Sequence, residues 1–119
     1  MKYSDLKKLL SKIRIAKPKI LVVGDVMLDH YVYGDVNRIS PEAPVPIINY
    51  EKEKELLGGA GNVAHNLVNL GAEVNIATII GNDLDGRTIR SLFKKIKVST
   101  QYVFSTKNIN STKKTRFLS

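Results

Sequence analysis

The sequence predicts an α/β fold, namely a doubly wound and mainly parallel sheet that carries a small β insertion. The first observation is that short apolar runs alternate along the chain with stretches of helical periodicity. The second is that residues 30–57 follow neither pattern, because prolines and charged residues divide them into short β segments. We therefore expect these residues to form a β insertion rather than a crossover helix.

A basic amphipathic helix is expected at the start of the chain. Ser4 can cap a helix that runs to about Ile15, in which leucine and isoleucine recur at helical spacing while lysines occupy the other face. Pro18 ends this helix. Residues 1–18 are therefore interpreted as an N-terminal basic helix, and residues 19–119 as the body of the domain.

The first buried strand is expected at residues 19–24, a β-branched apolar run that ends in glycine. Residues 25–29 follow at its carboxyl end, which is where open α/β sheets bind their ligands. Asp29 can accept hydrogen bonds from two adjacent hydroxyl groups, whereas Asp25 can also be a plain turn carboxylate. Asp29 is therefore a candidate for substrate binding.

Within the insertion, the residue types predict separate short strands. Tyr31–Tyr33 is expected to be a β segment closed by Gly34, residues 38–46 to be extended by their prolines, and residues 47–50 to be β again. Glu and Lys alternate over residues 51–55, which we expect to be exposed to solvent. The insertion should therefore have polar edges.

The second half of the chain repeats the alternation of helix and strand. Helices are expected at 61–70, ended by Gly71, and at 84–96, and strands at 73–80, at 98–105 and, as the start of a further one, at 115–119. A parallel sheet of three or four strands would keep an open edge and a half-covered face. We therefore expect the chain to be the N-terminal part of a longer domain.

The composition excludes several kinds of site. Cysteine is absent, which rules out disulfides, thiolate catalysis and cysteine-ligated zinc. The two histidines, His30 and His65, lack metal-ligand spacing, so no metal site is expected, and His65 is interpreted as a packing or surface residue. No apolar run reaches the ~20 residues that span a bilayer, and the start does not read as a secretory signal. We therefore expect a cytoplasmic protein with no membrane partner.

The formal net charge of +8 is concentrated at the two ends of the chain. Such a charge would suit nucleic acid, anionic lipid or a phosphorylated substrate. The lysine runs lack interleaved aromatic residues, so we interpret them as solvated helix faces. A nucleic-acid binder stays as an alternative that no motif supports, and it predicts an affinity that falls steeply with salt.

The strongest local signal is the run Gly-Gly-Ala-Gly-Asn-Val-Ala at residues 58–64, directly before a helix. One interpretation is dinucleotide binding, because Gly59, Gly61 and Ala64 fit the pattern G-x-G-x-x-A and Asp83 follows at about the expected distance. That fingerprint should follow the first buried strand at once, whereas a charged stretch precedes it here. A phosphate-binding loop is excluded, because no Gly-Lys-Ser/Thr follows the glycines.

The other interpretation is the recognition of a polyol. Asn62, in the first helical turn, offers both donors and an acceptor to vicinal hydroxyl groups. Together with Asp29 and the bare backbone of Gly58, Gly59 and Gly61, it would form a cradle for a sugar. A tight turn that precedes a capped helix, without any ligand, stays as the alternative.

The spacing of these glycines resembles the N-terminal signature of the ribokinase or PfkB carbohydrate kinases. Gly71 and Gly81 follow the run at residues 58–64 at the intervals of that signature. Residues 24–34 and 38–46 resemble, more narrowly, the kinase domain of D-glycero-β-D-manno-heptose 7-phosphate kinases. The resemblance therefore implies a ribokinase-like fold.

The resemblance covers most of the chain, including the predicted β insertion. It covers residues 19–119, which correspond to the N-terminal portion of the family domain, and residues 30–57 correspond to the family's β lid. Met27 departs from ribokinase itself, where a polar sugar contact is often found. This departure fits the heptose kinases better than a ribose kinase.

The resemblance also implies roles for individual residues. Five positions match those that hold sugar hydroxyl groups in the family, namely Asp29, Gly58, Gly59, Gly61 and Asn62. Arg38 in the lid is a candidate contact for the phosphate of a sugar phosphate, because its guanidinium fork suits that group. A surface or dimer-contact role for Arg38 is the equal alternative.

The implied parent enzyme transfers the γ-phosphate of ATP, with magnesium, to the anomeric hydroxyl of a heptose 7-phosphate, in ADP-heptose synthesis for lipopolysaccharide. The family's catalytic aspartate lies in a later Asp-Thr-x-Gly-Ala-Gly-Asp motif, which this sequence lacks. No catalytic, nucleotide-binding or metal-binding residue is therefore expected here, and the chain alone is expected to be inactive. The lid implies a homodimer. The alternatives are a fragment of another PfkB-type sugar kinase, and a non-catalytic sugar-binding or dimerisation module.

Overall fold

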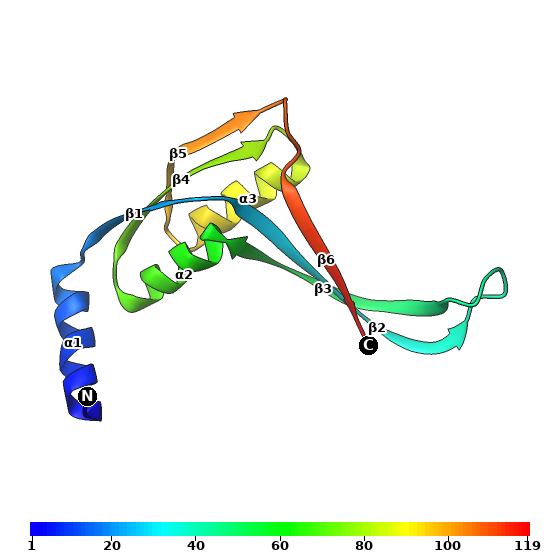
Figure 1. The fold of residues 1–119 in the computed structure, drawn as a ribbon, viewed down its shortest axis with the longest axis horizontal. Helices are drawn as coiled ribbons and strands as arrows, with labels where there is room; N and C mark the ends of the chain where they lie inside the picture. Colours follow the sequence, from blue (N-terminus) through cyan, green and yellow to red (C-terminus); the bar gives the residue numbers. More distant parts are fainter.

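The computed structural model describes all of residues 1–119 and contains three helices and six strands (Figure 1). Their order along the chain is α1 (Tyr3–Ala16), β1 (Lys19–Val23), β2 (Val26–Ile39), β3 (Pro46–Gly59), α2 (Ala60–Leu70), β4 (Glu73–Gly81), α3 (Leu84–Lys95), β5 (Ser99–Thr106) and β6 (Thr112–Leu118). The strands form two separate three-stranded sheets, with the orders β1-β4-β5 and β3-β2-β6.

The first sheet, β1-β4-β5, is entirely parallel and is covered on one face by α2 and α3 (Figure 1). Alternate residues of β4 point into this layer, and the core is built where they meet α3. Ile76, Ile80, Ile89 and Phe93 are fully buried there. The predicted α/β class with a mainly parallel sheet is confirmed. In this chain, however, both helices lie on the same face of the sheet.

The second sheet, which we call the lid sheet, consists of the long hairpin β2–β3 and of β6. Antiparallel pairing runs from Val26 opposite Gly59 to Ile39 opposite Pro46, so the strands are much longer than the short segments predicted. The expected end of the strand at Gly34 is wrong, because β2 passes through a register shift there and continues. The last strand, β6, pairs parallel with β2 rather than with the first sheet.

Helix α1 is largely exposed to solvent. It begins one residue before the predicted cap, Ser4, because the backbone N–H of Lys2 donates to the Asp5 carboxylate at 3.2 Å. It ends at Ala16, and the C-cap residue Lys17 adopts a left-handed conformation with a φ of 45°. None of its residues is buried. The helix therefore has an apolar stripe that few neighbours cover.

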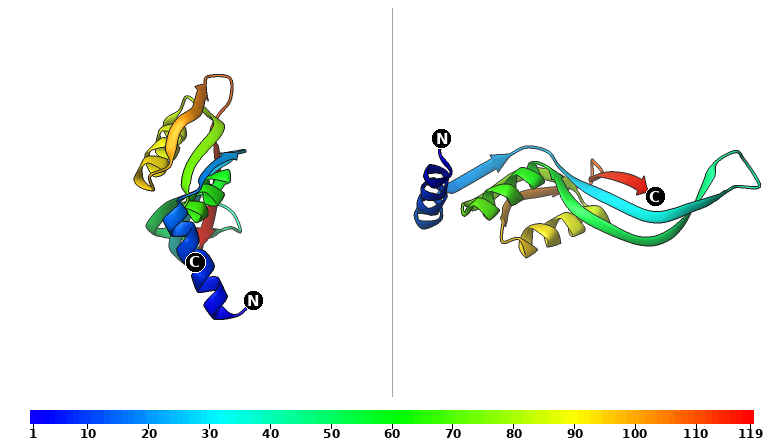
Figure 2. Two further views of the ribbon diagram at one scale, coloured as in Figure 1. Left: turned by 90° about the vertical axis from the view of Figure 1, so that its left-hand side faces the viewer. Right: turned by 90° about the horizontal axis from the view of Figure 1, so that it is seen from below.

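The molecule is flat and elongated, as the two perpendicular views of Figure 2 show. Its extents are 60 × 42 × 20 Å, and its radius of gyration is 18.7 Å. A compact chain of this length would have a radius of gyration of about 13.5 Å. The lid hairpin and α1 extend from opposite ends of the parallel sheet and account for the difference (Figure 1). None of the three helices combines the length and hydrophobicity that are needed to cross a membrane.

Candidate sugar-binding site

Asp29 lies within β2 rather than in a loop after β1, and it is paired with Leu56 of β3. Its side chain is only 19% exposed. One carboxylate oxygen accepts a hydrogen bond from Nη1 of Arg116 at 3.4 Å. The other lies against Gly58, where any Cβ would collide with it. Gly58 therefore makes the room in which the Asp29 carboxylate sits.

The other two glycines of the turn have different functions. Gly59 adopts a φ of 59°, and it lies so close to Asp25 that a Cβ would be 2.6 Å from the carbonyl oxygen of that residue. The next backbone N–H, that of Ala60, donates to the same carbonyl at 2.9 Å. Gly61 is buried, and a Cβ there would be 2.9 Å from Cβ of Leu57. Gly59 thus shapes the turn, while Gly61 allows α2 to approach β3.

Asp29 and Asn62 line the same hollow, which has a volume of about 610 Å³ and runs between β3 and the two helices. Asn62 lies in the first turn of α2 and is exposed. His65, which the sequence predicted to be a packing or surface residue, is half-buried and also lines this hollow. The hollow is otherwise lined by residues of β2, β3 and α3: Tyr31, Lys54, Glu55, Leu56, Leu57, Leu92, Lys95 and Ile96. The structure therefore brings together the carboxylate and the amide that were predicted to bind a polyol.

Arg38 lies near the far end of the lid hairpin, where it is paired with Ile47 and exposed to solvent. Nine residues of strand separate it from Asp29, which corresponds to roughly 30 Å. Arg38 and Asp29 of one chain therefore do not meet at the same small ligand.

Sequence reasoning missed Arg116, which lies in β6 beside Asp29 and Tyr31. Its Nη1 donates to the hydroxyl oxygen of Tyr31 at 3.0 Å, and its guanidinium carbon lies 5.2 Å from the centre of the Tyr31 ring. Arg116 is distant from Asp29 and Tyr31 in the sequence, and no local pattern predicts which strand β6 pairs with. Only the alternation of side chains along residues 112–118 could have indicated that Arg116 shares a face with Lys114.

Asp83 is the N-cap of α3, and its carboxylate is used in hydrogen bonds within the chain. Its carboxylate accepts hydrogen bonds from the backbone N–H groups of Ser111 and Gly86, both at 2.7 Å. These bonds, the one from Ser111 foremost, lower the pKa of Asp83 below its ordinary value. The glycine turn also follows β3 and not the first parallel strand. The dinucleotide-binding interpretation, which needed Asp83 as its acidic residue, therefore has no support.

A family model and curated relatives match most of the chain. The model of the pfkB family of carbohydrate kinases matches residues 17–119. The bifunctional protein HldE of Aliarcobacter butzleri is 48% identical over 102 residues, which cover 86% of this chain and 21% of the relative. HldE of Sulfurimonas denitrificans is 46% identical over 101 residues, with coverages of 85% and 21%. The chain thus spans about a fifth of the length of these relatives.

Solved structures of sugar kinases share the fold. A carbohydrate kinase from Agrobacterium tumefaciens superposes with a TM-score of 0.66 at 27% identity, over 84% of this chain and 31% of that protein. A ribokinase from Arabidopsis thaliana, complexed with ribose and ATP, gives a TM-score of 0.63 at 24% identity, over 85% of this chain and 32% of that protein. The predicted ribokinase-like fold is therefore confirmed.

Proposed function

Because the chain belongs to the PfkB family of carbohydrate kinases, we propose that it forms the sugar-binding part of an ATP-dependent kinase. The substrate is D-glycero-β-D-manno-heptose 7-phosphate, and the anomeric hydroxyl is the group phosphorylated, in ADP-heptose synthesis for lipopolysaccharide. The identity of nearly half of the aligned residues with the two HldE proteins supports this choice of substrate over ribose or fructose.

The observation that carries the proposal is the shared hollow of Asp29 and Asn62. A carboxylate accepts hydrogen bonds from two neighbouring hydroxyl groups, and an amide both donates and accepts, so the pair matches a vicinal diol. Gly58 keeps the space beside Asp29 free of side chain. The half-buried Asp29 carboxylate binds a polyol more tightly than a fully solvated one would, because less water competes for it.

The chemistry of phosphoryl transfer is assigned to parts of the kinase other than this chain. When bound, ATP with magnesium supplies the γ-phosphoryl group. The residues of this chain contribute by binding and orienting the sugar, and by excluding water from one side of it. The chain on its own is therefore expected to bind sugar without turnover.

The lid hairpin is proposed to contact a second copy of the chain. Its tip carries exposed apolar side chains, among them Ile39 at 68% and Val45 at 51% exposure. Exposed apolar residues on an extended hairpin favour a protein contact. In such a homodimer Arg38 would contact the partner rather than the sugar on its own Asp29.

The proposal is tested by calorimetric titration of D-glycero-β-D-manno-heptose 7-phosphate into the protein that carries this sequence. Asp29→Asn is expected to weaken binding by about 10- to 100-fold, because it removes a charge-assisted acceptor. Asp35→Asn is the matched control, since Asp35 lies further along β2 and is exposed. Equal binding by both variants and the wild type would remove Asp29 from the sugar site.

A further inference from the structure

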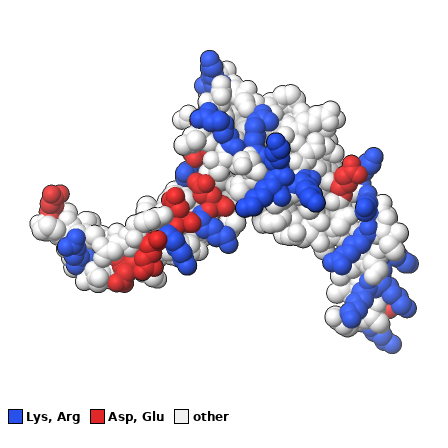
Figure 3. All heavy atoms as spheres, turned by 180° about the vertical axis from the view of Figure 1, so that it is seen from behind, with Lys and Arg blue, Asp and Glu red and all other residues white.

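The alternation of Glu and Lys over residues 51–55 separates the charges of the lid sheet onto opposite faces. Residues that are paired across the sheet point to the same side, as do every second residue of a strand. Four basic residues therefore share one face, which we call the cationic face: Lys52, Lys54, Lys114 and Arg116. Glu53 and Glu55 lie on the opposite face, and Figure 3, drawn from behind, shows acidic side chains gathered along the hairpin.

The two glutamates of the opposite face have contact partners of their own. His30 lies 2.9 Å from Glu53, and Lys113 lies 3.3 Å from Glu55 and 3.1 Å from Asp85. These contacts join β2, β3, β6 and α3 and leave no basic group of that face without an acidic partner. Glu53 and Glu55 are therefore both engaged in contacts within the chain.

The cationic face has no such balance. Its carboxylates are Asp29, which pairs with Arg116, and Asp35, six residues further along β2, which has no ion-pair partner. Lys52 lies over the ring of Tyr33 at 5.3 Å, and neither Lys54 nor Lys114 has an ion-pair partner. Four cations against two carboxylates leave a surplus of two positive charges. Such a surplus attracts an anion.

Tyr31 lies at the centre of this face, between two of the cations. It is paired with Lys54 of β3 on one side and with Arg116 of β6 on the other. Of the Arg116 nitrogens, only Nη1 is used within the chain, in the bonds to Asp29 and Tyr31. The guanidinium therefore has further N–H donors for a second, two-pronged contact with a phosphate group.

We infer that Arg116 and Lys54, on either side of Tyr31, bind the phosphate of the incoming sugar phosphate. Tyr31 and Lys54 line the same hollow as Asp29, and Tyr31 is two residues, about 7 Å, further along β2. That separation is comparable with the span of a pyranose ring and its exocyclic carbons. A sugar whose hydroxyl groups bind Asp29 would thus present a phosphate at its far end to these two cations. The inference depends on the proposed function for the sugar and goes beyond it by assigning its phosphate.

The test compares two substrates in the complete kinase that carries this sequence: the heptose 7-phosphate and the same heptose without phosphate. Arg116→Gln is expected to raise KM for the phosphorylated sugar by about 10- to 100-fold with little change in kcat. The unphosphorylated sugar should lose far less, because the substitution then acts on it only through the bond from Arg116 to Asp29. Arg116→Lys keeps the charge but not the fork, and it should restore part of the loss. Lys113→Gln, a neighbouring charge on the opposite face, is the control and should leave the ratio between the two substrates unchanged.

Two kinetic results would overturn the inference. One is an equal loss with both sugars, because Arg116 would then act only by orienting Asp29. The other is an unchanged KM for the phosphorylated sugar. Titration with inorganic phosphate, followed by the NMR shifts of the β6 amides, provides a readout that does not depend on turnover. If the wild type binds phosphate at Arg116 but phosphorylates neither sugar, the proposed function fails while the phosphate site stands. If phosphate causes no shift at Arg116, the site itself is disproved.

Discussion

At the scale of single residues, Gly58 and Gly61 lie in the same turn but must be glycine for different reasons. The space beside Gly58 is filled by the Asp29 carboxylate and by Cγ of Met27, which are movable side-chain atoms. The space beside Gly61 is filled by Cβ of Leu57 and by Val26, which belong to the packed core. The first glycine therefore leaves room for the Asp29 carboxylate, and the second leaves room for the packed core.

Gly61→Ala is accordingly expected to lower the free energy of unfolding by about 1–3 kcal/mol, because a methyl group is forced into a filled interior. Chemical denaturation of the protein, followed by circular dichroism, measures this change. Gly24→Ala is the comparison, since its Cβ would meet only Cβ of Ala60 at 3.2 Å. An equally small effect of both substitutions would show that α2 can shift away from β3 at little cost.

Gly58→Ala should instead affect ligand affinity and leave stability nearly unchanged. Its backbone is extended strand, which alanine adopts without strain, so the free energy of unfolding should change little. The new Cβ displaces the Asp29 carboxylate, so the affinity for heptose 7-phosphate should fall. Paired denaturation and calorimetry experiments separate the two quantities. Unaltered affinity in a folded Gly58→Ala protein would argue against a sugar contact at Asp29.

Asp83 gives a prediction for the dependence of stability on pH. Its pKa is lower in the folded state than its ordinary value of about 3.9, so folding favours the charged form. Its contribution is therefore fully present above about pH 4, and it is lost as the pH falls through the lowered folded pKa. The wild type should be more stable than Asp83→Asn at pH 6, and the difference should shrink below pH 4.

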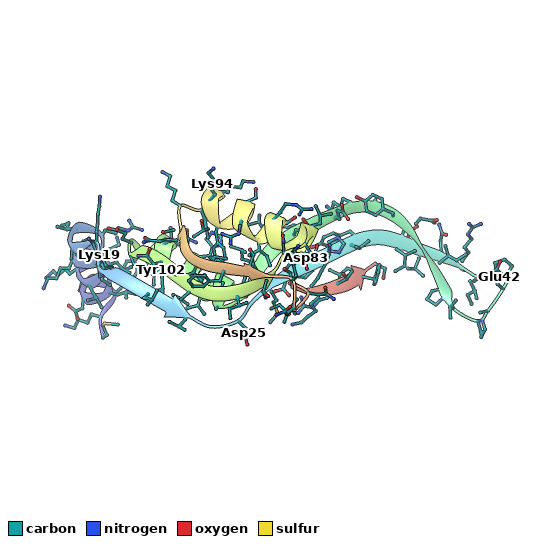
Figure 4. The ribbon with its side chains drawn as sticks, turned by 90° about the horizontal axis from the view of Figure 1, so that it is seen from above. Lys19, Asp25, Glu42, Asp83, Lys94 and Tyr102 are labelled. Atoms are coloured by element: carbon teal, nitrogen blue, oxygen red, sulfur yellow. The ribbon has the colours of Figure 1, made fainter.

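Thermal unfolding between pH 2 and pH 7 measures that difference. Glu42→Gln removes a carboxylate at the tip of the lid that accepts no hydrogen bond, and it is the control (Figure 4). A difference between wild type and Asp83→Asn that is the same at every pH would mean that the Asp83 carboxylate is not what joins α3 to the loop before β6.

At the scale of elements, local periodicity predicted the helices and parallel strands well but not the lid sheet. Helix α3 was expected at 84–96 and is found at Leu84–Lys95, because its apolar spacing and its cap are both local signals. Gly34 was expected to close a strand, yet it is buried within β2, where a Cβ would collide with the carbonyl oxygen of Asn49. The sequence alone does not distinguish a glycine that allows close approach of a neighbouring strand's backbone from a glycine that ends a strand.

The pairing of β6 with β2 could not be predicted for a related reason. Parallel neighbours are joined through long connections, so the sequence near Thr115 contains no information about which strand it will join. This pairing brings Arg116 next to Asp29, and so it also explains why the candidate site was predicted only in part. Asp29 and Asn62 could be proposed from their own surroundings, whereas Arg116 has its position only through β6.

Lys113 is expected to hold the lid sheet against α3, because its ammonium group binds Asp85 of α3 and Glu55 of β3. The bond to Asp85, foremost, raises the pKa of Lys113, so these contacts persist up to strongly alkaline pH. Lys113→Met should increase the rate of amide hydrogen exchange in β6 while leaving α2 unchanged. Protection in β6 equal to that of the wild type would mean that backbone pairing with β2 alone holds this strand.

At the scale of the whole molecule, the parallel sheet is covered on one face only. Leu21, Val23, Ile79 and Phe104 point to the open face and are each more than half exposed, and Tyr102, labelled in Figure 4, is 41% exposed. A contiguous apolar face of this kind is unusual on an isolated soluble protein. The buried strands of parallel sheets are normally covered on both sides.

The 119-residue chain is therefore expected to self-associate when it is produced alone. Analytical ultracentrifugation should show that its average mass increases with concentration, and Val23→Lys with Phe104→Lys should abolish the increase, because the charges oppose burial of the face. The matched control is Val36→Lys with Ile39→Lys, since both side chains are exposed on the lid hairpin. It distinguishes association through the open face of the sheet from association through the lid. If only the lid substitutions abolish association, the hairpin is the contact. If only the sheet substitutions abolish association, the open face is the contact. In the proposed kinase this face is then expected to be covered by further residues, and the same pair of lysines placed there should lower the thermal stability of that kinase.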